Sequence, residues 1–227
     1  MWELVKAGGW PMVPLLLLGI LALAIVLERF WSLRRNDVLP PGLGQDVGSW
    51  AARGRLDPAH LQALRANSPL GALLAAALEA RNRPRDQIRE RIEDTGRHLV
   101  HRMERFLDAL GTIASAGPLL GLLGTVVGMI QMFLGILDHG VGDVNQLAGG
   151  IGKALVCTAT GMIVAIPALM FHRYFKARIN GYVIQMEQEA SALLDALDGR
   201  GGVMNAGRAA ASAPSAPSAS RPAPARA

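Results

Sequence analysis

Residues 109–137 constrain this chain most strongly, because these 29 residues contain no Asp, Glu, Lys, Arg or His. A helix rises about 1.5 Å per residue, so the stretch would be about 43 Å long as a helix. The hydrocarbon core of a bilayer is only about 30 Å thick. The sequence therefore predicts a transmembrane helix with length to spare for tilt or for projection beyond the membrane.

Four glycines share one face of this predicted helix, since Gly117, Gly121, Gly124 and Gly128 are spaced by four, three and four residues. Small residues along one face allow another helix to approach closely. Thr125 lies about 100° round from that face and places a hydroxyl group in apolar surroundings. We therefore predict helix packing at the four glycines and interpret the segment as one built to pack in an assembly.

Two further uncharged segments, residues 7–27 and 154–171, are also long enough to cross a bilayer, the second with help from residues before Lys153. The chain is 51% hydrophobic and only 5% aromatic, which is typical of an α-helical membrane protein. No small-residue cleavage site follows the first segment, so we interpret it as an uncleaved span. The predicted fold class is an all-α membrane protein with three transmembrane helices and long cytoplasmic helical extensions.

The positive charges follow a topological pattern. All but two of the 23 Lys and Arg residues lie between the first two spans or after the third, the exceptions being Lys6 and Lys153. Because Lys and Arg concentrate in cytoplasmic segments, we expect a periplasmic N-terminus, a cytoplasmic loop over residues 29–108 and a cytoplasmic C-terminus. Topology thus accounts for the net charge of +5, and the expected partner is a lipid bilayer rather than a nucleic acid.

These patterns divide the chain into seven predicted segments. They are a first transmembrane span (1–31), a cytoplasmic helical domain (32–107), a second span (108–138), a periplasmic loop (139–150), a third span (151–172), a cytoplasmic helix (173–198) and a disordered cytoplasmic tail (199–227).

Proline and glycine breaks divide the first part of the cytoplasmic domain into short predicted helices. They are expected at residues 43–53, 58–66 and 69–81, and Ser68-Pro69 supplies an N-cap and a first helical position for the last of them.

Two long helices are expected to project from the membrane. An apolar stripe at helical spacing leads from residue 85 straight into the second span, which predicts one helix over residues 85–137 (Ile88, Ile92, Leu99, Met103, Phe106 and Leu110). A second stripe continues the third span from Phe175 to Leu197, and Gly199 is expected to end it. The remaining residues have too little apolar bulk to fold.

No catalytic or metal-binding constellation stands out, so neither an enzyme nor a cofactor is expected. Residues 150–154 resemble a phosphate-binding loop only superficially, because the required earlier glycine and the Ser or Thr after Lys153 are missing. His98 and His101 lie among arginines without a third ligand, which favours a solvated helix face over a metal site. The single Cys157 excludes a disulfide framework.

The third span also carries a face of small residues, formed by Ala154, Thr158, Gly161, Ala165 and Ala168. If this face packs against the glycine face, Thr125 and Thr158 contribute hydroxyls to a narrow lining, and polar groups within spans often line pathways. The alternative is that each hydroxyl merely bonds to its own helix or to a neighbouring one. Spacing alone leaves both interpretations open.

Two stretches carry a resemblance to a known family. Residues 114–128, ASAGPLLGLLGTVVG, and residues 151–167, IGKALVCTATGMIVAIP, resemble the transmembrane motifs of the ExbB/TolQ family of bacterial inner-membrane proton channels. The resemblance extends to the three-span layout, the periplasmic N-terminus and the large first cytoplasmic loop. It therefore covers about residues 1–198.

The resemblance implies a ring-forming homo-oligomer, typically a pentamer, around the single spans of an ExbD- or TolR-like partner that supplies the protonatable Asp. The family's pore-lining threonines correspond to Thr125 and Thr158. Such motors use the proton-motive force to energise TonB-dependent transport across the outer membrane, through a TonB-like protein. The alternatives are a TolQ-like role in envelope integrity, through a TolA-like protein, a gliding-type motor, or a scaffold that conducts nothing.

Lys153 departs from the family pattern, because many members carry Glu at this position. The residue is expected near the outer end of the third span. There it would either snorkel to the interface or pair with Asp138 or Asp143, or it would form a ring of basic groups at the pore entrance.

Overall fold

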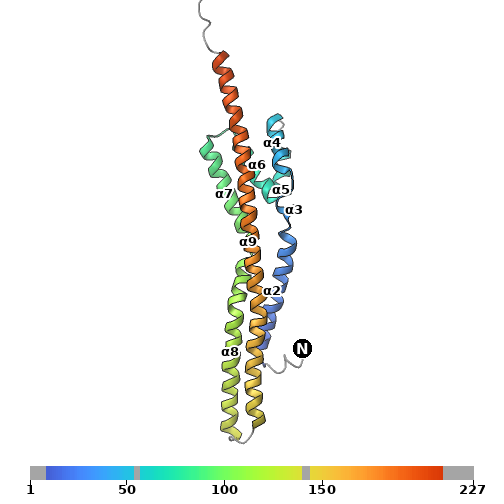
Figure 1. The fold of residues 1–227 in the computed structure, drawn as a ribbon, viewed down its shortest axis with the longest axis vertical. Helices are drawn as coiled ribbons and strands as arrows, with labels where there is room; N and C mark the ends of the chain where they lie inside the picture. Colours follow the sequence, from blue (N-terminus) through green and yellow to red (C-terminus); the bar gives the residue numbers. More distant parts are fainter. Residues whose placement is uncertain (1–8, 54–56, 140–143, 212–227) are drawn as a thin grey trace, which may run out of the picture.

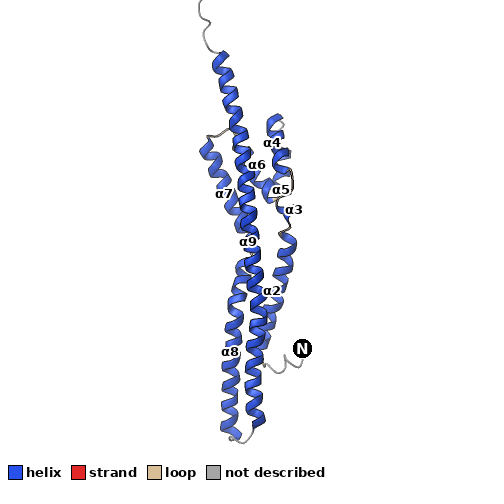
Figure 2. Ribbon diagram, in the orientation of Figure 1, coloured by secondary structure: helices blue, strands red, loops and turns tan. Residues whose placement is uncertain are grey.

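The computed structural model describes residues 9–53, 57–139 and 144–211, which form an elongated bundle of helices (Figures 1 and 2). Helix α9 runs along almost the whole molecule, with α2 and α8 packed along its lower half and α4, α6 and α7 along its upper half. The described helices are α2 (Met12–Ser32), α3 (Arg35–Val38), α4 (Leu43–Arg53), α5 (Pro58–Asn67), α6 (Pro69–Glu79), α7 (Arg85–Glu104), α8 (Leu107–His139) and α9 (Val144–Ala211).

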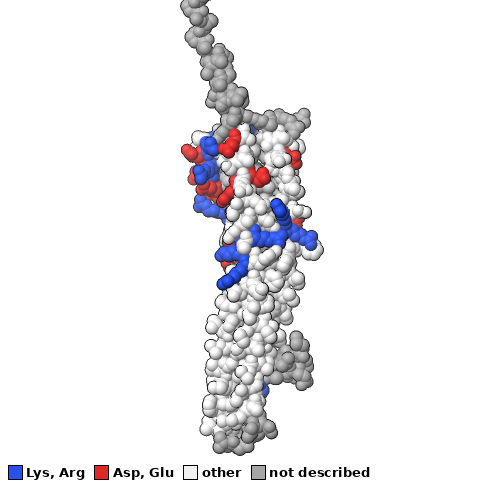
Figure 3. Space-filling view, viewed as in Figure 1, with Lys and Arg blue, Asp and Glu red and all other residues white. Residues whose placement is uncertain are grey.

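Among the described residues, three helices are long and apolar enough to cross a membrane, as predicted. The candidate spans are Met12–Ser32, Leu107–Leu137 and a stretch within Leu147–Leu197. On the face shown in Figure 3, charged side chains gather on the upper half of the molecule and are almost absent from the lower half. This separation matches a lower half surrounded by lipid and an upper half surrounded by water. The side of the membrane on which each half lies stays a prediction.

The predicted short helices are confirmed to within two residues at each end. Helix α6 begins where Ser68 accepts a 3.0 Å hydrogen bond from the backbone N–H of Gly71, with Pro69 in the first helical turn. Helix α5 begins after Asp57, which accepts a bond from the N–H of Ala59. Both caps satisfy backbone donors that have no partner inside the helix.

The single helix predicted over residues 85–137 is wrong, because a break at Arg105 and Phe106 separates α7 from α8. The carbonyl of Met103 accepts a 2.8 Å hydrogen bond from the guanidinium of Arg29, which belongs to α2. In an uninterrupted helix that carbonyl would accept from the backbone N–H of Leu107. A side chain from the first span thus takes the place of one backbone bond at the break.

The prediction that Gly199 ends the last helix is also wrong, since α9 continues to Ala211. A glycine within a helix costs only about 1 kcal/mol relative to alanine. The residues that follow include good helix formers such as Met204, Arg208 and Ala209. Helix α9 also begins earlier than expected, at Val144. Residues 212–227 of the predicted tail lie outside the described residues.

The two predicted apolar stripes meet in one core that continues from the apolar half into the charged half. Helix α9 buries residues at helical spacing, among them Phe175, Ile179, Tyr182 and Met186. Helices α6, α7 and α8 pack their own apolar side chains against them (Leu73, Leu74, Ile88, Ile92, Met103, Leu107 and Leu110). Phe106 is the exception in its stripe, because it lies at the helix break and stays 36% exposed.

Candidate functional site

Helices α8 and α9 approach closely along the glycine face of α8. A Cβ atom added at Gly117 would lie 3.1 Å from both the Cβ of Ala165 and the carbonyl oxygen of Gly161. One added at Gly128 would lie 3.1 Å from the Cβ of Ala154. Ordinary van der Waals contact begins at 3.4 Å, so α9 leaves almost no room for side chains at these positions. Within one chain, α9 therefore already covers the face that was expected to serve an assembly.

The centre of this contact brings Gly121, Gly124 and Gly161 against main-chain and small side-chain atoms. A Cβ at Gly121 would lie 3.1 Å from the Cα of Thr158, and one at Gly124 would overlap the sulfur of Cys157. A Cβ at Gly161 would lie 2.6 Å from the carbonyl oxygen of Gly117. All five glycines singled out from the sequence thus lie at the contact between α8 and α9.

Thr158 faces α8 from the middle of this contact. Its hydroxyl is half-buried and donates a 3.1 Å hydrogen bond to the carbonyl oxygen of Gly121. The missing side chain at Gly121 brings the two helices close enough for this bond to form. Thr158 therefore joins the second and third predicted spans by a polar contact.

Thr125 lies one turn after Gly121 on α8 and is half-buried. Its hydroxyl donates a 2.7 Å hydrogen bond to the carbonyl oxygen of Leu122, within its own helix. Ser and Thr often donate to their own helix in this way when no other acceptor is nearer. The oxygen of Thr125 keeps its lone pairs for a donor from outside the helix.

The two threonines meet at one peptide group. In an α-helix the backbone N–H of a residue donates to the carbonyl four positions earlier. The carbonyl of Gly121 is therefore the helical acceptor for the N–H of Thr125, and it is also the acceptor for the hydroxyl of Thr158. The hydroxyl of Thr158 and the backbone N–H of Thr125 thus meet at the Gly121 carbonyl, while the hydroxyl of Thr125 is bonded to the Leu122 carbonyl. The two hydroxyls share no direct hydrogen bond within the described residues.

This site contains hydroxyl groups but no group that titrates near neutral pH. Residues 109–137 and 154–171 include no Asp, Glu, His, Lys or Arg. Within the described part of the chain, no three His, Cys, Asp or Glu side chains lie close enough together to hold a metal ion. The arrangement can position water or a protonated group of another molecule through hydrogen bonds, but it does not itself carry a charge.

Lys153 lies on α9 next to Ala154, which packs against Gly128, and its own side chain is exposed. Of the expected ion-pair partners, Asp143 and the side chain of Asp138 lie outside the described residues. The single chain therefore leaves both interpretations of Lys153 open.

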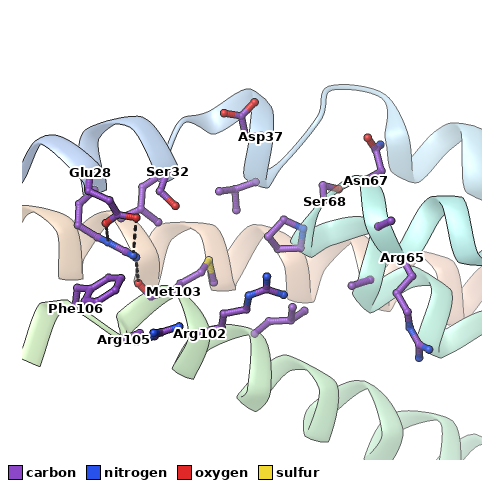
Figure 4. Close-up of a pocket in the computed structure, with 17 residues that line it drawn as sticks. Glu28, Ser32, Asp37, Arg65, Asn67, Ser68, Arg102, Met103, Arg105 and Phe106 are labelled. Carbon is purple, nitrogen blue, oxygen red and sulfur yellow. Dashed lines mark hydrogen bonds and ion pairs between the residues drawn. The ribbon is translucent and has the colours of Figure 1, made fainter. Parts of the chain in front are cut away.

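A buried arginine at the end of the first span was missed by the sequence analysis. Arg29 is 4% exposed, forms an ion pair with Glu28 and donates to the carbonyl of Met103 (Figure 4). The spacing of Ala22, Val26 and Arg29 puts the arginine on the buried face of α2, and this periodicity was the signal that could have found it.

The matches to known proteins cover the two helices that form the candidate site, α8 and much of α9. Residues 65–188, more than half of the chain, match the MotA/TolQ/ExbB proton channel family. The chain belongs to this family. The match includes α8, most of the apolar part of α9, and both threonines.

Individual relatives carry two different names within the family. The chain is 38% identical over 169 residues to the biopolymer transport protein ExbB-like 1 of Synechocystis, 73% of this chain and 66% of that protein. It is 34% identical over 127 residues to the biopolymer transport protein ExbB of Pseudomonas putida, 54% of this chain and 39% of the relative. It is 32% identical over 96 residues to the Tol-Pal system protein TolQ of Haemophilus influenzae, 42% of this chain and 40% of the relative. In each case the chain spans less than two thirds of the relative's length.

Proposed function

We propose that this chain is the channel and motor subunit of an ExbB/TolQ-type complex in the bacterial inner membrane. The observation that carries the proposal is the hydrogen bond from the Thr158 hydroxyl to the Gly121 carbonyl, which joins two membrane helices of a proton channel family member one turn from the hydroxyl of Thr125. In an apolar environment such polar groups are costly unless they are used, and they commonly mark pathways.

The proton carrier itself must come from another chain. A transferable proton needs a group that binds and releases it, and threonine hydroxyls do not titrate in the physiological range. Since residues 109–137 and 154–171 hold no carboxylate, we assign this role to an Asp in the single span of an ExbD- or TolR-like partner. Copies of this chain, five in a complete ring, would surround that span with α8 and α9 facing it.

The preferred biological role is to energise TonB-dependent transport across the outer membrane, with a TonB-like protein as the final recipient. Relatives named ExbB support this role, and the relative named TolQ supports Tol-Pal envelope maintenance as the second candidate. Deletion of the gene separates them. Loss of TonB-dependent uptake with an intact envelope supports the first role, and leakage of periplasmic proteins with normal uptake supports the second.

A flux measurement distinguishes a channel subunit from a passive scaffold. The chain and its single-span partner are co-purified and reconstituted into vesicles, and proton uptake is recorded after a potential is imposed. We expect flux only when both proteins are present, and loss of flux when the partner's Asp is replaced by Asn. A complex that assembles but shows the same background leak with either partner would contradict the channel assignment.

A further inference from the structure

A cavity lined by basic residues lies where the apolar half of the molecule meets the charged half (Figure 4). Its volume is about 430 Å³. Its walls come from the end of α2, from α3, from the turn between α5 and α6, and from the junction between α7 and α8. Six charged side chains line it (Glu28, Arg29, Asp37, Arg65, Arg102 and Arg105). Four parts of the sequence therefore converge on one basic site.

Two of the four arginines are already committed to the protein. Arg29 is bonded to Glu28 and to the Met103 carbonyl, so it forms a fixed part of the wall. Arg65 forms a 3.2 Å ion pair with Glu79, and Figure 4 shows its side chain directed away from the centre of the cavity. Neither guanidinium is free to be the main contact of a ligand.

Arg102 and Arg105 are available. Both side chains are exposed, and among the described residues Arg102 has no hydrogen bond or ion pair. Arg105 lies over the ring of Phe106 at 5.0 Å, on which Arg29 also stacks at 4.9 Å. The aromatic ring thus holds Arg105 beside the buried Arg29 while leaving its N–H groups for a ligand.

The remaining wall also suits an anion. Ser68 and Pro69 begin α6, and the first turn of a helix carries partial positive charge. The last turn of α2 lines the cavity with Glu28, Arg29 and Ser32. The same turn carries the exposed aromatic residues Phe30 and Trp31, which do not line the cavity but lie at the same level of α2. Aromatic side chains concentrate at the level of lipid headgroups, so an anion at this depth is most simply a phosphate attached to a lipid.

We propose that this cavity binds the phosphate of an anionic phospholipid through Arg102 and Arg105. The acyl chains would run along the exposed apolar side chains of α2 and α8. Guanidinium groups suit this task because their planar N–H donors match phosphate oxygens. The proposal requires only that α2 and α8 lie in a membrane, and it does not depend on proton conduction.

Two acidic groups facing the cavity make the proposal more specific. Glu28 is engaged by Arg29. Asp37, exposed on α3, has no ion pair within the described part of the chain. Its carboxylate repels a bound phosphate, so Asp37→Asn should strengthen lipid binding, a gain that a folding defect would not produce.

The test is a binding titration of the full-length protein in neutral detergent with dioctanoyl phosphatidylglycerol, followed by native mass spectrometry. Each basic residue near an anionic headgroup contributes roughly fivefold in affinity. We therefore expect R102Q/R105Q to weaken binding by at least about tenfold, R102K/R105K to retain most of it, and D37N to strengthen it. The matched control R81Q/R83Q removes the same charge from the exposed connection between α6 and α7.

Three outcomes would overturn the proposal. The first is lipid binding by R102Q/R105Q as tight as that of the parent protein. The second is an equal loss of binding in R81Q/R83Q, which would indicate a general charge effect. Inorganic phosphate that competes at the same concentration as the lipid, and with the same dependence on Arg102 and Arg105, would identify a soluble anion as the ligand.

Discussion

Replacing Gly161 by Ala should force α8 and α9 apart at the candidate site. The new Cβ would lie 2.6 Å from the carbonyl oxygen of Gly117 and 3.1 Å from the Cα of Gly121, and both are main-chain atoms that cannot rotate away. Contact at 3.4 Å instead of 2.6 Å requires a separation of 0.8 Å. The same movement lengthens the 3.1 Å bond from Thr158 to Gly121 to about 3.9 Å, beyond hydrogen-bond range.

The expected net destabilisation is about 1–3 kcal/mol. Overpacking costs about 1–3 kcal/mol, and loss of one hydrogen bond adds about 1 kcal/mol. The higher helix propensity of alanine offsets at most about 1 kcal/mol of this cost. Because 1 kcal/mol corresponds to about 2–4 °C in a chain of this size, Gly161→Ala should lower the melting temperature by at least a few degrees.

The assay is thermal unfolding of the purified protein in detergent, followed by circular dichroism at 222 nm as the reporter of helix content. Gly152→Ala is the matched control, because it lies on the same helix and a Cβ there meets nothing within 4 Å. The control should be neutral or slightly stabilising. Equal melting temperatures for the two variants would refute the close approach of α8 and α9 on which the site depends.

Three further predictions use the same assay, one at the contact between α8 and α9 and two elsewhere in the fold. Gly124→Ala should lower the free energy of unfolding, because its Cβ overlaps Cys157. In the double variant with Cys157→Gly, the loss should be at least about 1 kcal/mol smaller than the sum of the two single-variant losses. A loss equal to that sum would contradict the contact. Arg29→Met should cost about 1–3 kcal/mol, since a buried carbonyl loses its donor; an unchanged melting temperature would show that the helix break is maintained without this bond. Tyr182→Phe should cost about 1 kcal/mol, because the hydroxyl donates to the Leu33 carbonyl, and it should exceed the effect of Tyr174→Phe at an exposed ring; equal effects would contradict this assignment.

The membrane helices could be predicted because their determinants are local. An uncharged stretch of 29 residues and an apolar stripe at helical spacing each specify a helix without reference to the rest of the chain. The start of α6 was equally local, since Ser68 and Pro69 determine it within one turn. The glycine spacing predicted a close helix contact, although spacing alone does not say which helix makes it.

The break between α7 and α8 could not be predicted in the same way. At the break the Met103 carbonyl accepts from Arg29, which is 74 residues away in the sequence, and no local pattern near residue 105 records that contact. The end of α9 was mispredicted from a local signal, because Gly199 was taken as the end of the helix and α9 continues past it. A single glycine within a helix costs only about 1 kcal/mol relative to alanine. For the candidate site, spacing placed Thr158 on the small-residue face, but the bond to Gly121 required the three-dimensional structure.

The most direct test of the central claim compares proton flux through two threonine variants of the reconstituted complex. Thr158→Val removes the hydroxyl that joins α9 to the Gly121 carbonyl. Thr160→Val is the matched control, because its hydroxyl donates only to Val156 within α9. The proposed channel wall predicts that Thr158→Val abolishes partner-dependent flux while the complex still assembles, and that Thr160→Val conducts like the parent. Full flux through assembled Thr158→Val complexes would contradict the assignment.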